Sequence, residues 1–287
     1  MKGLSGHTHP FAVLGHPIGH TLSPVMHNAA FEALGLDAIY LAFDVAPDRL
    51  LAVLAGMKAM GFRGVNLTVP LKEVAFKGIE DLDASARRLG AVNTVEFTPD
   101  GCRGHNTDGT GFLMALRESF DFSVKGRELF VLGCGGAGRA IAITAAGEGA
   151  KRLILADIDA ERCRAIARDI ATLAPDTQVE LAGTTPAEWN TRTHRADLIV
   201  QASPVGMKAE DICPLAPSSF RPGQLAFDLV YNRPATCFTV AAGQGGAKAV
   251  NGLGMLLHQG AAAFTIWTGK PAAIEVMRAA IQNALYT

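Results

Sequence analysis

The first hundred residues alternate short apolar runs with longer segments that open on proline. The apolar runs predict strands at residues 11–15, 38–45 and 64–69. The segments that follow them predict helices at residues 24–34, 47–60 and 70–79. Strands and helices in alternation indicate a layered α/β domain.

The pattern continues after a predicted hairpin, whose strands at 91–97 and 102–106 surround the turn Pro99-Asp100-Gly101. A helix near 109–120 leads from the hairpin into a second α/β run. The strands of that run are expected at 129–133, 153–157, 179–182, 197–202 and 224–230, with helices between most of them. From Gly252 onward the pattern is helical, and helices are expected at 253–267 and 271–285.

A glycine-rich turn opens the second run, in the stretch VLGCGGAGRA at residues 131–140. Its glycines lie between a predicted strand and an alanine-rich helix. Glycine lets the backbone approach a pyrophosphate closely, and a helix N-terminus supplies amide donors and the positive end of its dipole. The turn therefore predicts a dinucleotide site, and the alternative is a merely tight turn.

Asp157 ends the next predicted strand, at the distance where an acid that binds ribose is expected. A carboxylate there accepts hydrogen bonds from the ribose hydroxyls of NAD and repels the 2′-phosphate of NADP. We therefore expect a preference for NAD. Arg162 and Arg164 lie nearby in sequence and offer NADP a partner, but we expect them on the exposed face of the helix at 160–173.

Polar side chains follow the predicted strands of the first run. Thr21 and Ser23 lie on a strand-to-helix turn, Thr68 lies at a strand end, and Asp108 precedes a helix. Each of these positions also has a structural interpretation. Ser23 and Asp108 fit helix N-caps, and Asn93 fits a group that satisfies a strand edge.

Lys72 is harder to explain by structure alone. It lies in the first turn of the helix expected at 70–79, where the helix dipole disfavours a cation. A lysine in that position needs a carboxylate partner or a chemical role, and proton transfer is such a role. The alternative is an ordinary exposed lysine.

Seven motifs, in this order and at these distances, resemble the shikimate/quinate dehydrogenase family. They are GHPIGHTLSP, NLTVPLKE, GAVNT, NTDGTG, GCGGAGRA, DLVYN and NGLGMLLHQ, and they span nearly the whole chain. The resemblance implies a substrate domain of residues 1–108 and 253–287, with an inserted Rossmann domain of residues 109–252 that binds NAD(P). It also implies an oxidoreductase that transfers hydride reversibly between nicotinamide and C3 of shikimate, giving 3-dehydroshikimate.

The resemblance makes Lys72 and Asp108 the catalytic pair. Lys72 would donate a proton to the carbonyl oxygen of 3-dehydroshikimate, and Asp108 would hold the lysine and bond a ring hydroxyl. The implied ligands of the substrate carboxylate are Thr21 and Ser23, helped by Tyr231. The residues implied to bind the ring hydroxyls or the carboxylate are Thr68, Asn93 and Gln259.

The resemblance also implies a set of cofactor-binding residues. Those at the glycine turn are Gly133, Gly135, Gly136 and Ala137. Asp157 is expected at the ribose, with Leu229 and Gly252 near the nicotinamide. Met255 is expected to pack against that region, and its alternative is a core methionine.

Two positions depart from the family pattern. The family's first motif usually has serine where this chain has Thr21, and the extra methyl group narrows or reorients the carboxylate pocket. The NADP-using members have an Asn-Arg-Thr type run where this chain has Ala156-Asp157-Ile158, which agrees with a preference for NAD. A quinate/shikimate enzyme and an aminoshikimate-type dehydrogenase therefore stay open as alternatives. A non-catalytic NAD- or shikimate-binding regulator is a further alternative, against which the presence of both Lys72 and Asp108 weighs.

Composition narrows the expected partners and surroundings. The formal charge is −1 with no long run of one sign, so neither nucleic acid nor a membrane is expected as a partner. Five cysteines without a C-x-x-C pair, and an N-terminus without an apolar signal segment, favour the cytoplasm. The histidines lack zinc-site spacing, so no metal is expected. A monomer or a homodimer is expected.

Overall fold

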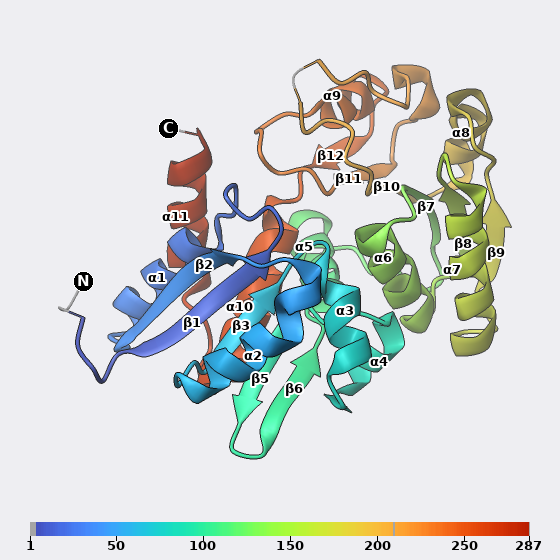
Figure 1. The fold of residues 1–287 in the computed structure, drawn as a ribbon. Helices are drawn as coiled ribbons and strands as arrows, with labels where there is room; N and C mark the ends of the chain where they lie inside the picture. Colours follow the sequence, from blue (N-terminus) through green and yellow to red (C-terminus); the bar gives the residue numbers. More distant parts are fainter. Residues whose placement is uncertain (1–3, 209, 287) are drawn as a thin grey trace. The chain divides into compact units, whose positions relative to one another are not determined.

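The computed structural model describes residues 4–208 and 210–286, which fold as two compact units (Figure 1). The first unit is the chain up to Gly111 together with the chain from Leu257 onward, and the second is Phe112–Leu256. The divisions fall inside two helices, α5 (Asp108–Phe120) and α10 (Leu253–Thr268). Each unit combines a sheet with helices, which confirms the predicted α/β class.

Within the described residues, the first unit contains a six-stranded mixed sheet of order β2-β1-β3-β5-β6-β4. β1 pairs in parallel with β2 and β3, whereas β5 is antiparallel to both β3 and β6. The hairpin expected from the sequence is therefore present. The strands are β1 (His9–Gly15), β2 (Ala38–Asp44), β3 (Gly64–Leu67), β4 (Asp81–Leu82), β5 (Thr94–Thr98) and β6 (Gly101–His105).

Helices cover this sheet and bury its apolar side chains. The core of the first unit includes Leu14, Leu54 and Val65, all nearly inaccessible to solvent. The C-terminal helix α11 packs against α1 at the start of the chain (Figure 1). The remaining bounds are α1 (Ser23–Ala33), the 3-10 turn Pro47–Arg49, α2 (Leu50–Ala59), α3 (Leu71–Gly78), α4 (Ala84–Leu89) and α11 (Ile274–Tyr286).

The second unit is a parallel doubly wound fold whose sheet has the order β12-β11-β10-β7-β8-β9. The chain proceeds outward from β7 to β9 and then returns to β10, so the strand order reverses beside β7. Open parallel sheets bind ligands outside the carboxyl ends of their strands at such a reversal. The strands are β7 (Glu128–Leu132), β8 (Arg152–Ala156), β9 (Gln178–Leu181), β10 (Leu198–Gln201), β11 (Leu225–Asp228) and β12 (Lys248–Val250).

The helices of the second unit follow these strands in the manner of crossover connections. Their core partners include Phe130, Ile154 and Ile199, which are fully buried. The helices are α6 (Gly136–Gly147), α7 (Ala160–Leu173), α8 (Pro186–Arg192) and α9 (Cys237–Gln244), with 3-10 turns at Thr193–Arg195 and Pro217–Ser219. Within residues 4–208 and 210–286, no helix combines the length and the apolar character that a membrane span requires.

Several local expectations need correction. The helix expected to be capped by Ser23 has Leu22 as its N-cap residue, and Ser23 is its first helical residue with no side-chain capping bond. The strand expected at 91–97 begins only at Thr94, and the side chain of the preceding residue, Asn93, points toward Thr107 and Asp108. The last helix begins at Ile274 rather than residue 271.

Candidate active site

Lys72 and Asp108 form an ion pair in the first unit, with 2.7 Å between Lys72 Nζ and Asp108 Oδ2. Lys72 lies in the first turn of α3, and Asp108 is the first residue of α5. A helix dipole favours a carboxylate and disfavours an ammonium group at such positions, so Asp108 supplies a counter-charge that offsets the cost at Lys72. The two side chains are 25% and 10% exposed, which leaves the lysine reachable by a ligand.

The sheet of the first unit brings several of the predicted site residues to one edge, which is formed by the carboxyl ends of β1, β3 and β6. β1, β3 and β6 run in the same direction, and the segments that follow them carry Thr21, Thr68 and Asp108. Because β5 is antiparallel to β3, the residue that precedes β5 lies at that same edge, and that residue is Asn93. Residues distant in sequence therefore meet through strand order, which no single motif reveals.

Asn93 connects Asp108 to the rest of this edge. Its Nδ2 donates to Asp108 Oδ1 at 2.9 Å and to Thr107 Oγ1 at 2.9 Å, and its Oδ1 accepts from the Thr107 amide at 2.8 Å. Asn93 Nδ2 also lies 3.5 Å from Gln259 Oε1. One oxygen of Asp108 thus binds Lys72 and the other binds Asn93, so the carboxylate cannot rotate without breaking a bond.

Thr21 and Ser23 place two hydroxyl groups together at the start of α1. Thr21 Oγ1 lies 3.3 Å from Ser23 Oγ and accepts a hydrogen bond from the Ser23 amide at 3.3 Å. Thr68 lies at the end of β3, where Gly15 makes room for it: a Cβ on Gly15 would lie 2.5 Å from Thr68 Cγ2. These hydroxyl groups can donate to a carboxylate or accept from a ring hydroxyl.

A buried polar layer beneath these groups was missed by the sequence reasoning. The Tyr40 hydroxyl donates to Asn66 Oδ1 at 2.7 Å, and Asn66 Nδ2 donates to Thr94 Oγ1 at 3.0 Å. Burial raises the pKa of the Tyr40 phenol well above its usual value, and a hydrogen bond with Ser23 opposes that rise. The available signal was an asparagine inside the apolar run GVNLTV.

The glycine turn of the second unit divides into packing positions and open positions. Gly133 has φ +94°, and a Cβ on Gly138 would lie 1.7 Å from the Gly133 carbonyl oxygen, so these two glycines allow α6 to sit against the turn. Around Gly135 and Gly136, by contrast, no described atom lies within 4 Å of an added Cβ. The open space and the free amides at the start of α6 fit a pyrophosphate, with Ala137 exposed beside them.

Asp157 lies directly after β8 and is 5% exposed. Its Oδ2 accepts the Cys134 amide at 2.6 Å and its Oδ1 accepts the Asp159 amide at 2.9 Å. Two backbone bonds thus fix the carboxylate against the glycine turn. The arginines nearby are paired: Arg162 Nε lies 3.5 Å from Asp159 Oδ2, and Arg164 Nε lies 2.8 Å from Glu161 Oε1.

Two of the remaining predicted cofactor residues, Leu229 and Gly252, meet just beyond the end of β11. A Cβ on Gly252 would lie 2.2 Å from the Leu229 carbonyl oxygen, so only glycine permits this approach. Met255 lies on α10 and is 8% exposed. This burial fits the alternative interpretation of Met255, which is a core methionine. Burial raises the pKa of the Tyr231 phenol in the same loop. Tyr231 belongs to the second unit, whereas the other predicted substrate residues belong to the first.

Asp228, the last residue of β11, was not predicted from the sequence. Its carboxylate is fully buried and accepts the Thr236 hydroxyl at 2.5 Å and the Val230 amide at 3.0 Å. Burial raises its pKa to about 6 in spite of these bonds. The two hydrogen bonds accepted by Asp228 fix the loop that carries Leu229 and Tyr231.

Among the described residues, no three His, Cys, Asp or Glu side chains are grouped to hold a metal ion. His16 Nδ1 binds Asp44 Oδ1 at 2.5 Å. His27 is stacked on Tyr40 with 4.3 Å between ring centroids, and its ring nitrogens have no hydrogen-bond partner among the described residues. Trp189 and Trp267 each donate the indole N–H to a backbone carbonyl.

Comparisons with known proteins agree with this arrangement. Residues 13–95 match the model of the shikimate dehydrogenase substrate binding domain, and residues 252–282 match that of the shikimate 5'-dehydrogenase C-terminal domain. The chain is 45% identical to a shikimate dehydrogenase (NADP(+)) of Moorella thermoacetica, over 96% of this chain and 92% of that protein.

Solved structures of similar fold carry related names. Shikimate 5-dehydrogenase from Listeria monocytogenes, in complex with shikimate and NAD, is 34% identical with a TM-score of 0.91, over 98% of this chain and 99% of that one. Quinate dehydrogenase from Corynebacterium glutamicum, in complex with NAD, is 27% identical with a TM-score of 0.86, over 96% and 99%.

Proposed function

This chain belongs to the shikimate dehydrogenase family, and we propose that it catalyses the reversible oxidation of shikimate to 3-dehydroshikimate with a nicotinamide cofactor, NAD being preferred. The Lys72–Asp108 pair carries the proposal. An ammonium group held 2.7 Å from a carboxylate and still partly exposed suits proton transfer to an oxygen of the substrate. A protein that only binds its ligand has little use for such a lysine at a helix start.

Lys72 moves the proton in this proposal. During reduction its Nζ donates a proton to the C3 carbonyl oxygen, and its charge stabilises the alkoxide that develops there. During oxidation the same nitrogen accepts the proton of the C3 hydroxyl. Asp108 orients the Lys72 amine through a 2.7 Å hydrogen bond, and Asn93 donates to the other carboxylate oxygen of Asp108 at 2.9 Å.

The hydroxyl and amide groups of the same edge orient the substrate. We assign Thr21 and Ser23 to the carboxylate of the polyol acid, together with Tyr231. Thr68, Asn93 and Gln259 are assigned to ring hydroxyls or to the carboxylate. The partner is thus a small polyol acid.

The second unit suits a dinucleotide. Open space at Gly135 and Gly136, at the N-terminus of α6, accommodates a pyrophosphate beside Ala137, and Gly133 shapes the turn. Leu229, Gly252 and Met255 are assigned to the nicotinamide end. When bound, the cofactor supplies the hydride for reduction and takes it up in oxidation.

The preference for NAD rests on the surroundings of Asp157. Its fixed carboxylate suits the ribose hydroxyls and repels a 2′-phosphate. Ile158, which follows it, is 80% exposed and offers no charge to a phosphate. Arg162 and Arg164 already pair with acids at the start of α7, namely its N-cap residue Asp159 and Glu161. The Moorella thermoacetica relative is named for NADP(+), so this chain would differ from it in cofactor.

Quinate is the second candidate substrate, favoured by Thr21 and by the proposed use of NAD. The extra methyl of Thr21 alters the space around the carboxylate, and a structural neighbour at 27% identity is a quinate dehydrogenase in complex with NAD. An aminoshikimate-type substrate places an amino group where these have a hydroxyl, and an assay of such an amino analogue beside shikimate and quinate would distinguish it.

The proposal also includes the cellular compartment and the oligomeric state. All five cysteines are free thiols, which suits the reducing cytoplasm. We propose a monomer or a homodimer there, and sedimentation of the purified protein at micromolar concentration distinguishes the two.

The experiment that tests the proposed function is a matrix of initial rates at 340 nm. Shikimate and quinate are each assayed with NAD and with NADP, and binding of both ligands is measured in parallel. We expect turnover with shikimate, and a kcat/KM about tenfold or more higher with NAD than with NADP. Binding without NADH formation from either polyol acid would instead support a regulator, and faster turnover with NADP would refute the cofactor assignment.

A further inference from the structure

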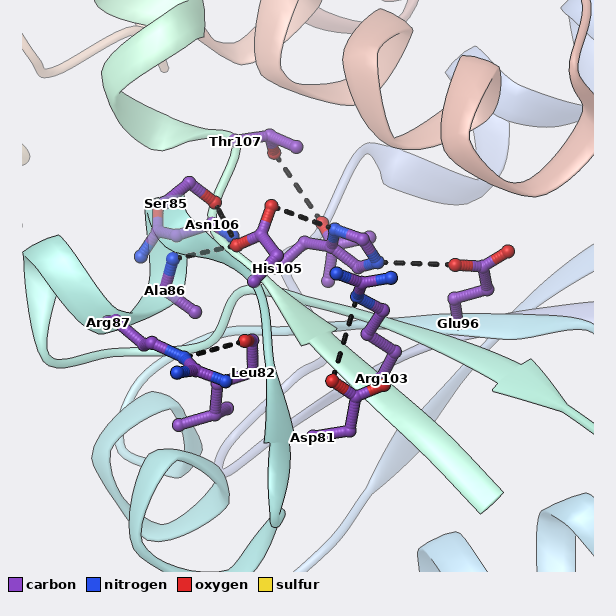
Figure 2. A network of polar contacts seen from close by, with 12 residues as sticks. Asp81, Leu82, Ser85, Ala86, Arg87, Glu96, Arg103, His105, Asn106 and Thr107 are labelled. Atoms are coloured by element: carbon purple, nitrogen blue, oxygen red, sulfur yellow. Dashed lines mark hydrogen bonds and ion pairs between the residues drawn. The ribbon is translucent and has the colours of Figure 1, made fainter. Parts of the chain in front are cut away.

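The segment that carries Asp108 is tied to the start of α4 by a chain of hydrogen bonds. Asp83 caps α4: its Oδ1 accepts the Ala86 amide at 2.9 Å and the Ser85 hydroxyl at 2.6 Å. The Ser85 oxygen in turn accepts the Asn106 amide at 2.8 Å. Figure 2 shows Ser85 and Asn106 side by side at this junction.

Each bond in this chain has a forced direction. A carboxylate only accepts, so the single Ser85 proton points to Asp83 and leaves the Ser85 lone pairs for the Asn106 amide. Asn106 is 3% exposed, and its side chain is fixed at both ends. Nδ2 donates to the Ala91 carbonyl at 2.9 Å, and Oδ1 accepts the Asp108 amide at 3.0 Å.

Asp83 makes a second connection to the same segment through His105. Asp83 Oδ2 lies 3.1 Å from His105 Nδ1. Glu96 Oε2 lies 3.3 Å from His105 Nε2, as Figure 2 shows. His105 and Asn106 are consecutive residues, and Thr107 and Asp108 follow them directly. The start of α4 therefore binds the side chain of His105 and the backbone of Asn106, which lie just before the start of α5.

We propose that Ser85 is a positioning residue for the Asp108–Lys72 pair. Its hydroxyl fixes Asn106, the Asn106 side chain fixes the first amide of α5, and from there Asp108 reaches Lys72. Ser85 belongs to none of the groups assigned to substrate or cofactor. The inference rests on the proposed function, because it gives Ser85 the role of orienting the acid–base pair of that reaction.

Loss of the Ser85 hydroxyl has a defined consequence. The Asn106 amide is left without its acceptor in a buried position, which the segment relieves only by moving. A shift of a few tenths of an ångström at Asp108 changes the direction of the Lys72 amine, and catalytic rates respond steeply to such shifts. Thr21 and Ser23, which are assigned to the substrate carboxylate, lie outside this segment, whereas Asn93 contacts it through Thr107 and Asp108. We therefore expect a large effect on kcat and a smaller one on KM.

The test compares Ser85→Ala with Ser85→Thr, which keeps a hydroxyl, and with Arg87→Ala as a matched control. Arg87 lies on the same helix and donates its Nε–H to the Leu82 carbonyl at 2.8 Å, a bond that involves neither Ser85 nor Asn106 (Figure 2). Rates are expressed per cofactor-binding site, so that unfolded protein is not counted. We expect S85A to lower kcat about tenfold with KM within about threefold, S85T to restore most of the rate, and R87A to stay near wild type.

A double-mutant cycle separates positioning from stability. If Ser85 acts through Asp108, S85A has less than about a twofold effect on kcat in an Asp108→Asn background. Equal proportional losses in both backgrounds, or a loss in S85A that S85T does not relieve, would overturn the inference while leaving the proposed function intact. A wild-type protein without activity on shikimate and quinate would refute the proposed function, and this inference with it.

Discussion

At the scale of single residues, His27 shows how strongly the fold can perturb one side chain. Its imidazole is buried among Phe31, Tyr40, Phe264 and Trp267, and burial lowers its pKa from 6.5 to about 3. The ring is therefore neutral in the folded protein at any moderate pH. In the unfolded chain it takes up a proton below about pH 6.5.

This difference predicts a pH-dependent stability. Because the folded pKa is depressed, the contribution of His27 is fully present above pH 6.5 and is lost as the pH falls toward 3. Between pH 7 and pH 5 the loss amounts to about 2 kcal/mol. Asp228 acts in the opposite sense, because its raised pKa favours the folded state as the pH falls through about 6.

The comparison of wild type with His27→Phe isolates the histidine. The variant keeps an aromatic ring in the stack and has no proton to bind. Urea unfolding at pH 7 and pH 5 should show that the variant gains about 2 kcal/mol relative to wild type at the lower pH. An unchanged difference between the two proteins would mean that His27 is not neutral in the folded state.

The cofactor preference also belongs to single residues. Replacing Asp157 with serine removes the charge that repels a 2′-phosphate, and Ile158→Arg supplies a cation next to it. The double variant should raise the ratio of kcat/KM for NADP to that for NAD by about tenfold or more. Ile158→Arg alone serves as the control, since Asp157 then still faces the phosphate. A ratio that stays at the wild-type value would locate the discrimination elsewhere.

At the scale of elements, the glycines in the turn between β7 and α6 have two distinct roles. Some are needed for the turn to fold, and others leave space for the cofactor. An alanine at 138 would press its Cβ against the Gly133 carbonyl, whereas an alanine at 135 would enter open space. We predict that Gly138→Ala costs about 3 kcal/mol or more and abolishes cofactor binding with it. Gly135→Ala should leave the melting temperature unchanged and still weaken cofactor binding. Equal losses of stability in both variants would contradict this division.

Elements with a strong local pattern were predictable from the sequence, and those held by pairing were not. The helix at 160–173 has an N-cap aspartate and a clear apolar stripe, and α7 has the predicted bounds. β4 has two residues and exists because it pairs with β6, and β12 has three and pairs with β11. α4 is the short stretch ASARRL, and its two buried side chains, Ala86 and Leu89, are too few to predict a helix.

The residues of the candidate site likewise divide into those that the sequence predicted and those that it did not. Lys72 stood out because a cation at a helix start is anomalous, and the partner it needs is Asp108. That these two meet depends on β5 pairing with β3 as well as with β6. The sequence pattern predicts the β5–β6 hairpin but not its pairing with β3. Ser85 and Tyr40 carried no local signal, since a serine near a helix start and a tyrosine in a strand are ordinary.

At the scale of the whole molecule, the proposal assigns substrate to the first unit and cofactor to the second. A ligand stabilises the part of a protein that binds it, by about 2.7 kcal/mol at a concentration one hundred times its Kd. Hydrogen exchange should therefore slow in residues 112–256 with saturating NAD. With shikimate alone it should slow in residues up to 111 and from 257 onward. The reverse pattern would contradict the assignment of the two units.

The most direct test of the account is the steady-state rate of Lys72→Ala, measured beside Lys77→Ala from the last turn of the same helix. We predict that K72A lowers kcat for shikimate oxidation by about a thousandfold, with KM within about threefold, because the lysine handles a proton that moves only in the transition state. K77A should match wild type. A K72A enzyme that keeps its kcat and shows only a raised KM would contradict the central claim.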